Sequence, residues 1–298
     1  MANKHATVAP LLGQATASLR GAGVDSPELT AERLLMHVLR CQRAELYLAP
    51  ELPLSHRQQA QFAALLARRR RHEPLQYLTG EVEFMGLSLR VRPGVLIPRP
   101  ETETLVERAV AFCQRELHGI RPVRCLDVGT GCGNIAASLA ALLPHAQVVA
   151  IDCSEQALAV ARENLRRLRL TARVQLVGAD LRSPDFARRV RGTFHLVTAN
   201  LPYVPTGELA TLAPEVRNHE PRMALDGGPD GLDLYRLLIP LLPQLLSPAG
   251  GYFAEIGVSQ APQLRSLLEG AGLVQIEVLP DLAGRERVVF ARTPRERA

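Results

Sequence analysis

The amino-acid sequence predicts an α/β fold in which a helical N-terminal domain and a β-hairpin linker precede a sheet with crossover helices. Three observations support this prediction. Helix patterns without strand patterns fill the first 73 residues, a short hairpin pattern follows, and strand and helix patterns alternate after it. Such alternation is typical of a parallel sheet. We therefore expect a helical domain at 1–73, a linker at 74–92 and a larger domain at 93–298.

The helical domain is expected to contain several helices within residues 6–72. One should begin at Ser26-Pro27, with Ser26 as N-cap and Pro27 at the first helical position. Another should begin at Ser55. The apolar residues expected inside these two helices are Ala31, Leu34, Leu35, Val38, Leu39, Ala60, Ala63, Leu65 and Leu66. The arginines at 68–71 fit a solvated helix end, and docking on an acidic or RNA surface is the alternative.

The linker and the larger domain are predicted from the strand, loop and helix patterns after residue 73. Glu83–Val91 predicts two short strands that turn at Gly86, and a proline-rich loop then leads to a helix near Glu103. Further strands are expected near 123–128, 147–151, 173–177, 194–199, 251–256, 274–279 and 286–292. Helices are expected near 103–117, 134–142, 154–168, 232–246 and 259–271.

Composition narrows the class of protein. The chain is 47% hydrophobic and 22% charged, and no apolar run reaches the roughly eighteen residues of a membrane-spanning helix. Its five cysteines form no CxxC pair and its first residues show no secretory signal, so we expect a cytoplasmic protein with reduced thiols. The net charge of +5 is compatible with a nucleic-acid partner without requiring one. No residue cluster has metal-ligand spacing, and no metal site is expected.

A glycine-rich turn follows the strand that ends at Val128, and its residues are Gly129, Thr130, Gly131, Cys132 and Gly133. A strand, glycines and a helix N-terminus together place backbone N–H groups beside a ligand, as in Rossmann-like nucleotide sites. Asp152 ends the next strand and can accept hydrogen bonds from two ribose hydroxyls, although it could instead cap the helix near Ser154. Asp180 and Leu181 follow the third strand, where Asp180 could accept from an adenine amino group. These strand ends predict a nucleotide-like cofactor.

A second motif, Asn200-Leu201-Pro202-Tyr203, follows the apolar strand at 194–199. At this strand end the motif suggests a site for a planar group that bears an amide or an amine. A turn that merely closes the strand is the alternative for the motif in isolation.

This motif resembles the (Asn/Asp)-Pro-Pro-(Tyr/Phe) motif of methyltransferases that act on exocyclic amino or amide nitrogen. The wider sequence is similar to the HemK/PrmC family, the peptide chain release factor glutamine N5-methyltransferases. The further segments that carry the resemblance are Pro74–Gly80, Gly94–Glu103, His219–Arg222, Leu225–Leu232 and Asp281–Arg285. The resemblance covers nearly the whole chain, and its departure is Leu201, where the family usually has Pro.

The resemblance implies a class I methyltransferase sheet that uses S-adenosylmethionine and releases S-adenosylhomocysteine. It implies a methyl transfer to the glutamine of the Gly-Gly-Gln motif in class I release factors, with the helical domain gripping the protein substrate. Asn200 would contact both cofactor and substrate, and its side-chain oxygen and the Leu201 carbonyl would accept the hydrogens of the amide NH2 group. Leu201, Pro202 and Tyr203 would complete the substrate pocket, with Tyr203 as its wall. No nucleic acid is required. The alternatives are methylation of a ribosomal-protein glutamine, methylation of a DNA or RNA amino group, and a non-enzymatic RNA-binding module.

Overall fold

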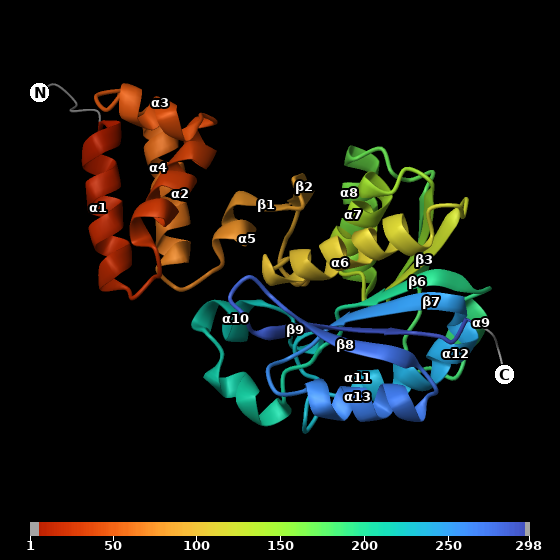
Figure 1. Ribbon diagram of the computed structural model, residues 1–298. Coiled ribbons are helices and arrows are strands. Elements are labelled where there is room, and N and C mark those ends of the chain that lie inside the picture. Colours follow the sequence, from red (N-terminus) through yellow and green to blue (C-terminus); the bar gives the residue numbers. More distant parts are fainter. Residues whose placement is uncertain (1–5, 296–298) are drawn as a thin grey trace, which may run out of the picture. The chain divides into compact units, whose positions relative to one another are not determined.

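The computed structural model describes residues 6–295, which form two compact units (Figure 1). The first unit comprises the residues up to Glu81 together with Ala213–His219. The second comprises Val82–Leu212 and the residues from Glu220 onward. The sequence did not predict that a segment beyond residue 200 joins the helical unit. The expected domain boundaries at 73–74 and 92–93 stay a prediction.

The first unit is helical, as the sequence predicts. Its helices are α1 (Val8–Gly21), α2 (Pro27–Leu39), α3 (Arg43–Leu48), α4 (His56–Arg69), α5 (Leu75–Thr79) and α10 (Pro214–His219). Its core contains Leu19, Leu34, Leu35 and Leu54, whose side chains are fully buried. In the described residues, no helix is long and apolar enough to cross a membrane.

The sequence predicts helix starts at Ser26 and Ser55, and the structure confirms both, with a side-chain cap at Ser55 but not at Ser26. Ser55 caps α4, since its hydroxyl accepts from the Gln58 N–H at 3.3 Å in a capping box. Ser26 precedes α2 but its side chain makes no capping hydrogen bond. The reason is its backbone: φ is 47°, in the left-handed region, whereas a capping side chain needs an extended backbone.

The buried face of α4 differs from the prediction. Ala60 and Ala63 are exposed, while Phe62 and Leu65 are buried. The large Phe62 ring removes more apolar surface from water than an alanine methyl does, so it determines which face turns inward. Arg69 lies on this face at 5% exposure and donates to Glu215 of α10 at 2.7 Å. The expectation of a solvated arginine run is therefore wrong for Arg69.

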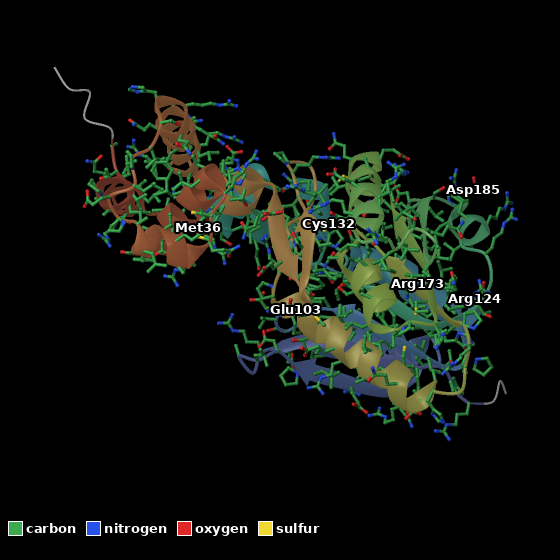
Figure 2. All side chains as sticks on the ribbon, turned by 90° about the horizontal axis from the view of Figure 1, so that it is seen from above. Met36, Glu103, Arg124, Cys132, Arg173 and Asp185 are labelled. Carbon is green, nitrogen blue, oxygen red and sulfur yellow. The ribbon has the colours of Figure 1, made fainter. Side chains whose placement is uncertain are left out.

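The second unit begins with a hairpin of β1 (Glu81–Phe84) and β2 (Leu87–Arg90). Met85 and Gly86 form its two-residue turn with φ of 50° and 72°, the left-handed pair that such a turn requires. Glu103 holds this turn, because its carboxylate accepts from the Met85 N–H at 2.6 Å (Figure 2). The predicted hairpin is confirmed.

A seven-stranded sheet forms the centre of the second unit, in the order β5-β4-β3-β6-β7-β9-β8. Its strands are β3 (Val123–Val128), β4 (Ala146–Asp152), β5 (Val174–Gly178), β6 (Phe194–Ala199), β7 (Leu246–Glu255), β8 (Val274–Pro280) and β9 (Glu286–Arg292). The sheet is mostly parallel, as the sequence predicts, and β9 is antiparallel to both of its neighbours. Residues 281–285 join β8 to β9, and five residues are too few for the crossover that parallel strands need.

Helices cover both faces of this sheet, α6, α7 and α8 on one and α11, α12 and α13 on the other (Figure 1). The helical elements of this unit are α6 (Glu101–Glu116), α7 (Asn134–Leu142), α8 (Glu155–Arg167), α9 (Phe186–Arg189), η1 (Thr206–Thr211), η2 (Arg222–Ala224), α11 (Asp233–Leu238), η3 (Ile239–Leu241), α12 (Leu242–Leu245) and α13 (Ala261–Gly270). The single helix expected at 232–246 is divided into three pieces. Pro240 and Pro243 cause the breaks, because proline lacks the N–H that a continuous helix needs.

The strand order positions the candidate site. From β3 the chain adds β4 and β5 on one side and then returns to place β6 on the other. Ligands of open α/β sheets bind at the carboxyl ends of strands where the order reverses in this way. Here that point lies between β3 and β6, at which Val128 pairs with Ala199. The turns that begin at Gly129 and Asn200 are therefore neighbours.

The contact between Arg69 and Glu215 generates a prediction on stability. We expect Arg69→Met to lower the free energy of unfolding by about 3 kcal/mol, because Glu215 is left without its cation in a partly buried place. Arg70→Met is the control, since Arg70 is exposed and its change should stay within about 0.5 kcal/mol. Urea unfolding of both variants makes the comparison, and equal stabilities would show that the ion pair contributes nothing.

Candidate active site

A cavity in the second unit opens at the carboxyl ends of β3, β4, β5 and β6. Ten of the residues predicted from the sequence line it: Gly129, Thr130, Gly131, Cys132, Asp152, Asp180, Leu181, Asn200, Leu201 and Pro202. Two predicted residues, Gly133 and Tyr203, are not in its lining. Gly133 instead precedes the first residue of α7. The structure thus brings the two predicted motifs into one site.

The glycine-rich turn has room for a ligand at its centre. A Cβ atom on Gly129 would lie 3.1 Å from the Leu201 side chain and 3.3 Å from the Asn200 carbonyl oxygen. Gly129 therefore allows the two turns to pack closely. A Cβ atom on Gly131 would meet no atom within 4 Å, and its φ of 56° favours glycine. The backbone at Gly131 is consequently open to the cavity.

Asp152 connects the glycine turn to the start of α8. Its Oδ2 accepts from the Gly131 N–H at 2.8 Å, and its Oδ1 accepts from the Ser154 N–H at 2.8 Å. The N-cap of α8 is Ser154, whose hydroxyl accepts from the Ala157 N–H, and Asp152 is hydrogen-bonded to the same N-cap region through the Ser154 N–H. Burial raises the pKa of Asp152. Each carboxylate oxygen keeps a further lone pair, which suits two hydroxyl donors.

Asp180 lies at the outer side of the cavity. Its side chain is 45% exposed, and its Oδ1 accepts from the Arg182 N–H at 2.9 Å. The adjoining lining is apolar and comprises Ile135, Ile151, Ala179, Leu181 and Phe186. An apolar slot with one acceptor at its edge suits a flat ring that carries an amino group.

Asn200 is held by two partners that the sequence reasoning missed. Its Nδ2 donates to Thr102 Oγ1 and to Glu255 Oε2, both at 3.2 Å. Since Nδ2 is turned towards these two oxygens, Oδ1 is the atom left to accept from a ligand. The pairing of Ala199 with Ala254 places Glu255 beside Asn200. The available signal was a single acidic residue at the end of an otherwise apolar strand.

Tyr203 contacts the same carboxylate from the other side. Its hydroxyl donates to Glu255 Oε1 at 3.0 Å, and its main-chain carbonyl accepts from Gln260 at 2.9 Å. Burial raises the pKa of the Tyr203 phenol, so this hydroxyl stays protonated as a donor. The expected role of Tyr203 as a pocket wall stays a prediction.

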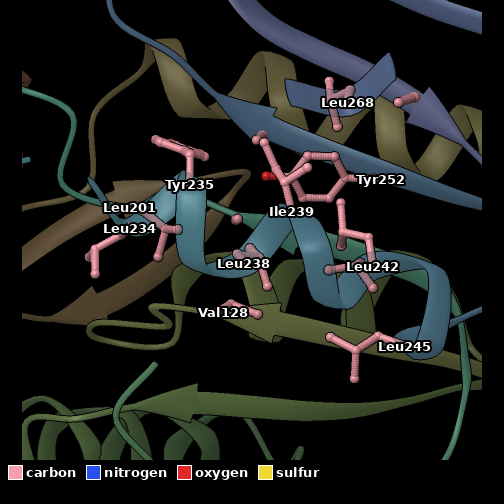
Figure 3. Close-up of a cluster of buried hydrophobic side chains, with 14 of the residues drawn as sticks. Val128, Leu201, Leu234, Tyr235, Leu238, Ile239, Leu242, Leu245, Tyr252 and Leu268 are labelled. Carbon is pink, nitrogen blue, oxygen red and sulfur yellow. The ribbon is translucent and has the colours of Figure 1, made fainter. Parts of the chain in front are cut away.

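Leu201 is 4% exposed and belongs to the main hydrophobic cluster of the unit, with Val128, Leu234 and Tyr235 (Figure 3). Its carbonyl is the second acceptor that the sequence predicts. A leucine leaves its own φ angle free, in contrast to proline. Burial of the side chain supplies the missing restraint, because any large rotation would withdraw it from the cluster.

The proline-rich loop adds a buried ion pair beside the cavity. Arg99, which lines the cavity, donates to Glu220 Oε1, and the Ile97 N–H donates to Glu220 Oε2 at 3.1 Å. The Glu220 side chain is 1% exposed. Sequence reasoning did not assign Glu220, although it lies in the segment His219–Arg222 that carries the resemblance. The pair ties the loop before α6 to the loop after β6.

Asp127 is fully buried beneath the glycine turn. Its Oδ1 accepts from the Thr198 hydroxyl at 2.9 Å, while its Oδ2 has no hydrogen-bond partner among the described residues. Burial raises the pKa of Asp127 to about 6. A carboxyl group whose pKa rises on folding costs stability wherever it is ionised in the folded state.

This burial predicts a pH-dependent stability difference. Between the usual Asp pKa of about 3.9 and a folded value of about 6, the folded state binds more protons than the unfolded state, so stability falls as pH rises. We expect Asp127→Asn to be more stable than the parent by about 3 kcal/mol at pH 8. The difference should vanish near pH 4. Denaturant unfolding at both pH values measures it, and a gap independent of pH would contradict the assignment to Asp127.

The chain is similar to known proteins over nearly all its length. The family model for the PrmC N-terminal domain matches residues 10–80, and that for a methyltransferase domain matches residues 125–219. A release factor glutamine methyltransferase of Geobacter sulfurreducens is 41% identical over 96% of both chains. One of Moorella thermoacetica is 43% identical over 96% of this chain and 98% of its own. The chain also resembles the hMettl16 catalytic domain, which was solved in complex with the MAT2A 3'UTR hairpin 1. The TM-score is 0.56 and the identity 15%, over 83% of this chain and 84% of that one, so the two share the fold.

Proposed function

The chain belongs to the release factor glutamine methyltransferase family, and on that premise we propose that it methylates N5 of the glutamine in the Gly-Gly-Gln motif of class I release factors, with S-adenosylmethionine as methyl donor. The single observation that carries this proposal is the orientation of Asn200. Its Nδ2 donates within the protein, to Thr102 and Glu255, so its oxygen remains to receive an amide hydrogen of the substrate.

The cavity fits S-adenosylmethionine by its chemistry. The Asp152 oxygens would accept from the ribose hydroxyls, Gly131 leaves space at the turn, and Asp180 with its apolar neighbours would hold the adenine. The remaining cofactor-binding residues of this proposal are Gly129, Thr130, Cys132, Gly133, Leu181 and Asn200. The bound cofactor supplies an electrophilic methyl group on a sulfonium. The protein's task is then to present a nucleophile to it.

A glutamine amide is a poor nucleophile because its nitrogen lone pair is shared with the carbonyl. Two acceptors, Asn200 Oδ1 and the Leu201 carbonyl, would hold the NH2 group and favour the positive charge that develops on the nitrogen. A preorganised polar group of this kind contributes about 3–4 kcal/mol to the transition state. Further acceleration comes from holding the reacting atoms roughly 3–3.5 Å apart. No strong base is needed, since the methylated nitrogen becomes acidic and releases its proton afterwards.

We assign recognition of the protein substrate to the helical domain, residues 1–73, and the chemistry to residues 93–298. A release factor is a protein, and only the side chain of its target glutamine would enter the cavity beside the cofactor. Affinity therefore needs a second contact surface outside the cavity. The match of residues 10–80 to a domain characteristic of the family supports this division.

The role of Asp152 gives a prediction on cofactor affinity. Asp152→Ala should weaken binding of S-adenosylhomocysteine by roughly ten- to a hundredfold, because charge-assisted hydrogen bonds to the ligand are lost. Glu163→Ala, which removes an exposed carboxylate of α8, should bind normally. Titration calorimetry on both variants decides the matter. Unchanged affinity in the Asp152 variant would remove this residue from the site.

Methyl transfer itself is tested by peptide-resolved mass spectrometry on an unmodified release factor incubated with the protein and S-adenosylmethionine. We expect one added methyl group on the Gly-Gly-Gln glutamine. Asn200→Ala should retain S-adenosylhomocysteine binding and lose at least about a hundredfold in rate, since an oriented acceptor is removed.

Two results would overturn the proposed function. If the parent protein binds the cofactor yet leaves the release factor unmodified, a ribosomal protein becomes the first alternative substrate and a nucleic acid the second. If Asn200→Ala methylates at a near-normal rate, the proposed mechanism is wrong even though the substrate is right.

A further inference from the structure

Glu255, the last residue of β7, joins three groups around the acceptor site. Its side chain is 2% exposed. It accepts hydrogen bonds from the Thr102 hydroxyl at 2.5 Å, from Asn200 Nδ2 at 3.2 Å and from the Tyr203 hydroxyl at 3.0 Å. Thr102 and Asn200 line the cavity, and Tyr203 belongs to the same motif as Asn200. The buried Glu255 carboxylate therefore holds side chains that line or adjoin the cavity.

The directions of these hydrogen bonds depend on one another. The Thr102 hydroxyl has a single hydrogen, which it gives to Glu255, so its oxygen can accept from Asn200 Nδ2. All three donors point at Glu255 only if that group is an acceptor, as an ionised carboxylate is. If the Asn200 amide were rotated by half a turn, its oxygen would face the carboxylate and Thr102. The carboxylate therefore selects one orientation of the amide.

Resting on the proposed function, we propose that Glu255 is a positioning residue for methyl transfer. As a carboxylate it holds the Asn200 amide with Oδ1 towards the acceptor nitrogen. Its negative charge, hydrogen-bonded to the N–H side of the amide, also polarises Asn200 and makes Oδ1 a stronger acceptor. Asn200 and Glu255 thus act as one unit, in which Glu255 touches neither the substrate nor the cofactor.

Charged groups and hydrogen-bond donors around Glu255 act on its pKa in opposite directions. Burial raises its pKa, and Glu101 of α6 acts in the same direction. The donors Thr102 and Tyr203 lower it, as does the positive charge of Arg287 of β9. The folded-state pKa lies above the usual value for glutamate, which is about 4.3. Loss of activity through Glu255 is consequently expected on the acidic side.

The decisive variant is Glu255→Gln, which keeps the size of the side chain and removes its charge. A glutamine NH2 group would place donors against Asn200 and favour the rotated amide. We expect kcat to fall by about a hundredfold, with the KM for S-adenosylmethionine changed less than about threefold. Glu116→Gln is the matched control, because Glu116 pairs with Arg292 away from the cavity, and its rate should equal that of the parent.

A double variant separates positioning from a general structural role. In the Asn200→Ala background, Glu255→Gln should cost nothing further, because the group through which it acts is already absent. Glu255→Asp keeps a carboxylate and should recover part of the rate. The acidic decline of kcat should be present in the parent and absent in Glu255→Gln. Additive losses, or a normal rate in Glu255→Gln, would overturn the proposal.

A measurement without turnover distinguishes this proposal from the proposed function. The side-chain ¹⁵N–¹H₂ signal of Asn200, identified by its loss in Asn200→Ala, should titrate with Glu255 in the parent saturated with S-adenosylhomocysteine. It should be independent of acidic pH in Glu255→Gln. If the release factor is not methylated but this titration occurs, the function is wrong and the positioning role stands. If the Asn200 signal is the same in both proteins at every pH, the positioning role is wrong.

Discussion

The site depends on the close approach of two turns at the carboxyl ends of β3 and β6. Parallel pairing places Val128 beside Ala199, so the residues that follow must occupy adjacent space. Glycine suits position 129, because its φ is 78° and a Cβ there would lie 3.1 Å from the Leu201 side chain. This close packing brings the glycine-rich turn and the motif at residues 200–203 beside one cavity. Every proposed function of either motif requires that proximity.

A second constraint is the burial of negative charge around this cavity. Asp127, Asp152 and Glu255 end three different strands or lie within one residue of their ends, and burial raises the pKa of each. Such carboxylates oppose folding unless they are hydrogen-bonded. Asp152 and Glu255 have partners on both oxygens, whereas one oxygen of Asp127 has none among the described residues.

Features that depend on a local sequence pattern could be predicted. Contacts between residues far apart in the sequence could not. The strands β3 to β6 are apolar runs followed by glycine-rich or polar motifs, so their positions and ten of the residues that line the cavity could be predicted. Glu255 lies 55 residues from Asn200, and only the register of β6 with β7 reveals that they touch. The broken helix at 232–246 was foreseeable from Pro240 and Pro243. By contrast, the folding of residues 213–219 with the helical unit left no local signal, since the partner of Glu215 is Arg69.

Leu201 shows how a departure from a family motif can preserve its geometry. The acceptor proposed at this position is a main-chain carbonyl, which leucine and proline share. Proline restrains the chain through its ring, and the following Pro202 already biases residue 201 towards an extended backbone. The leucine side chain adds about 2 kcal/mol of burial to that bias, which is lost if the turn rotates out of the cluster. Packing against Val128 and Leu234 thus replaces a covalent restraint, and the same core that folds the sheet fixes the acceptor.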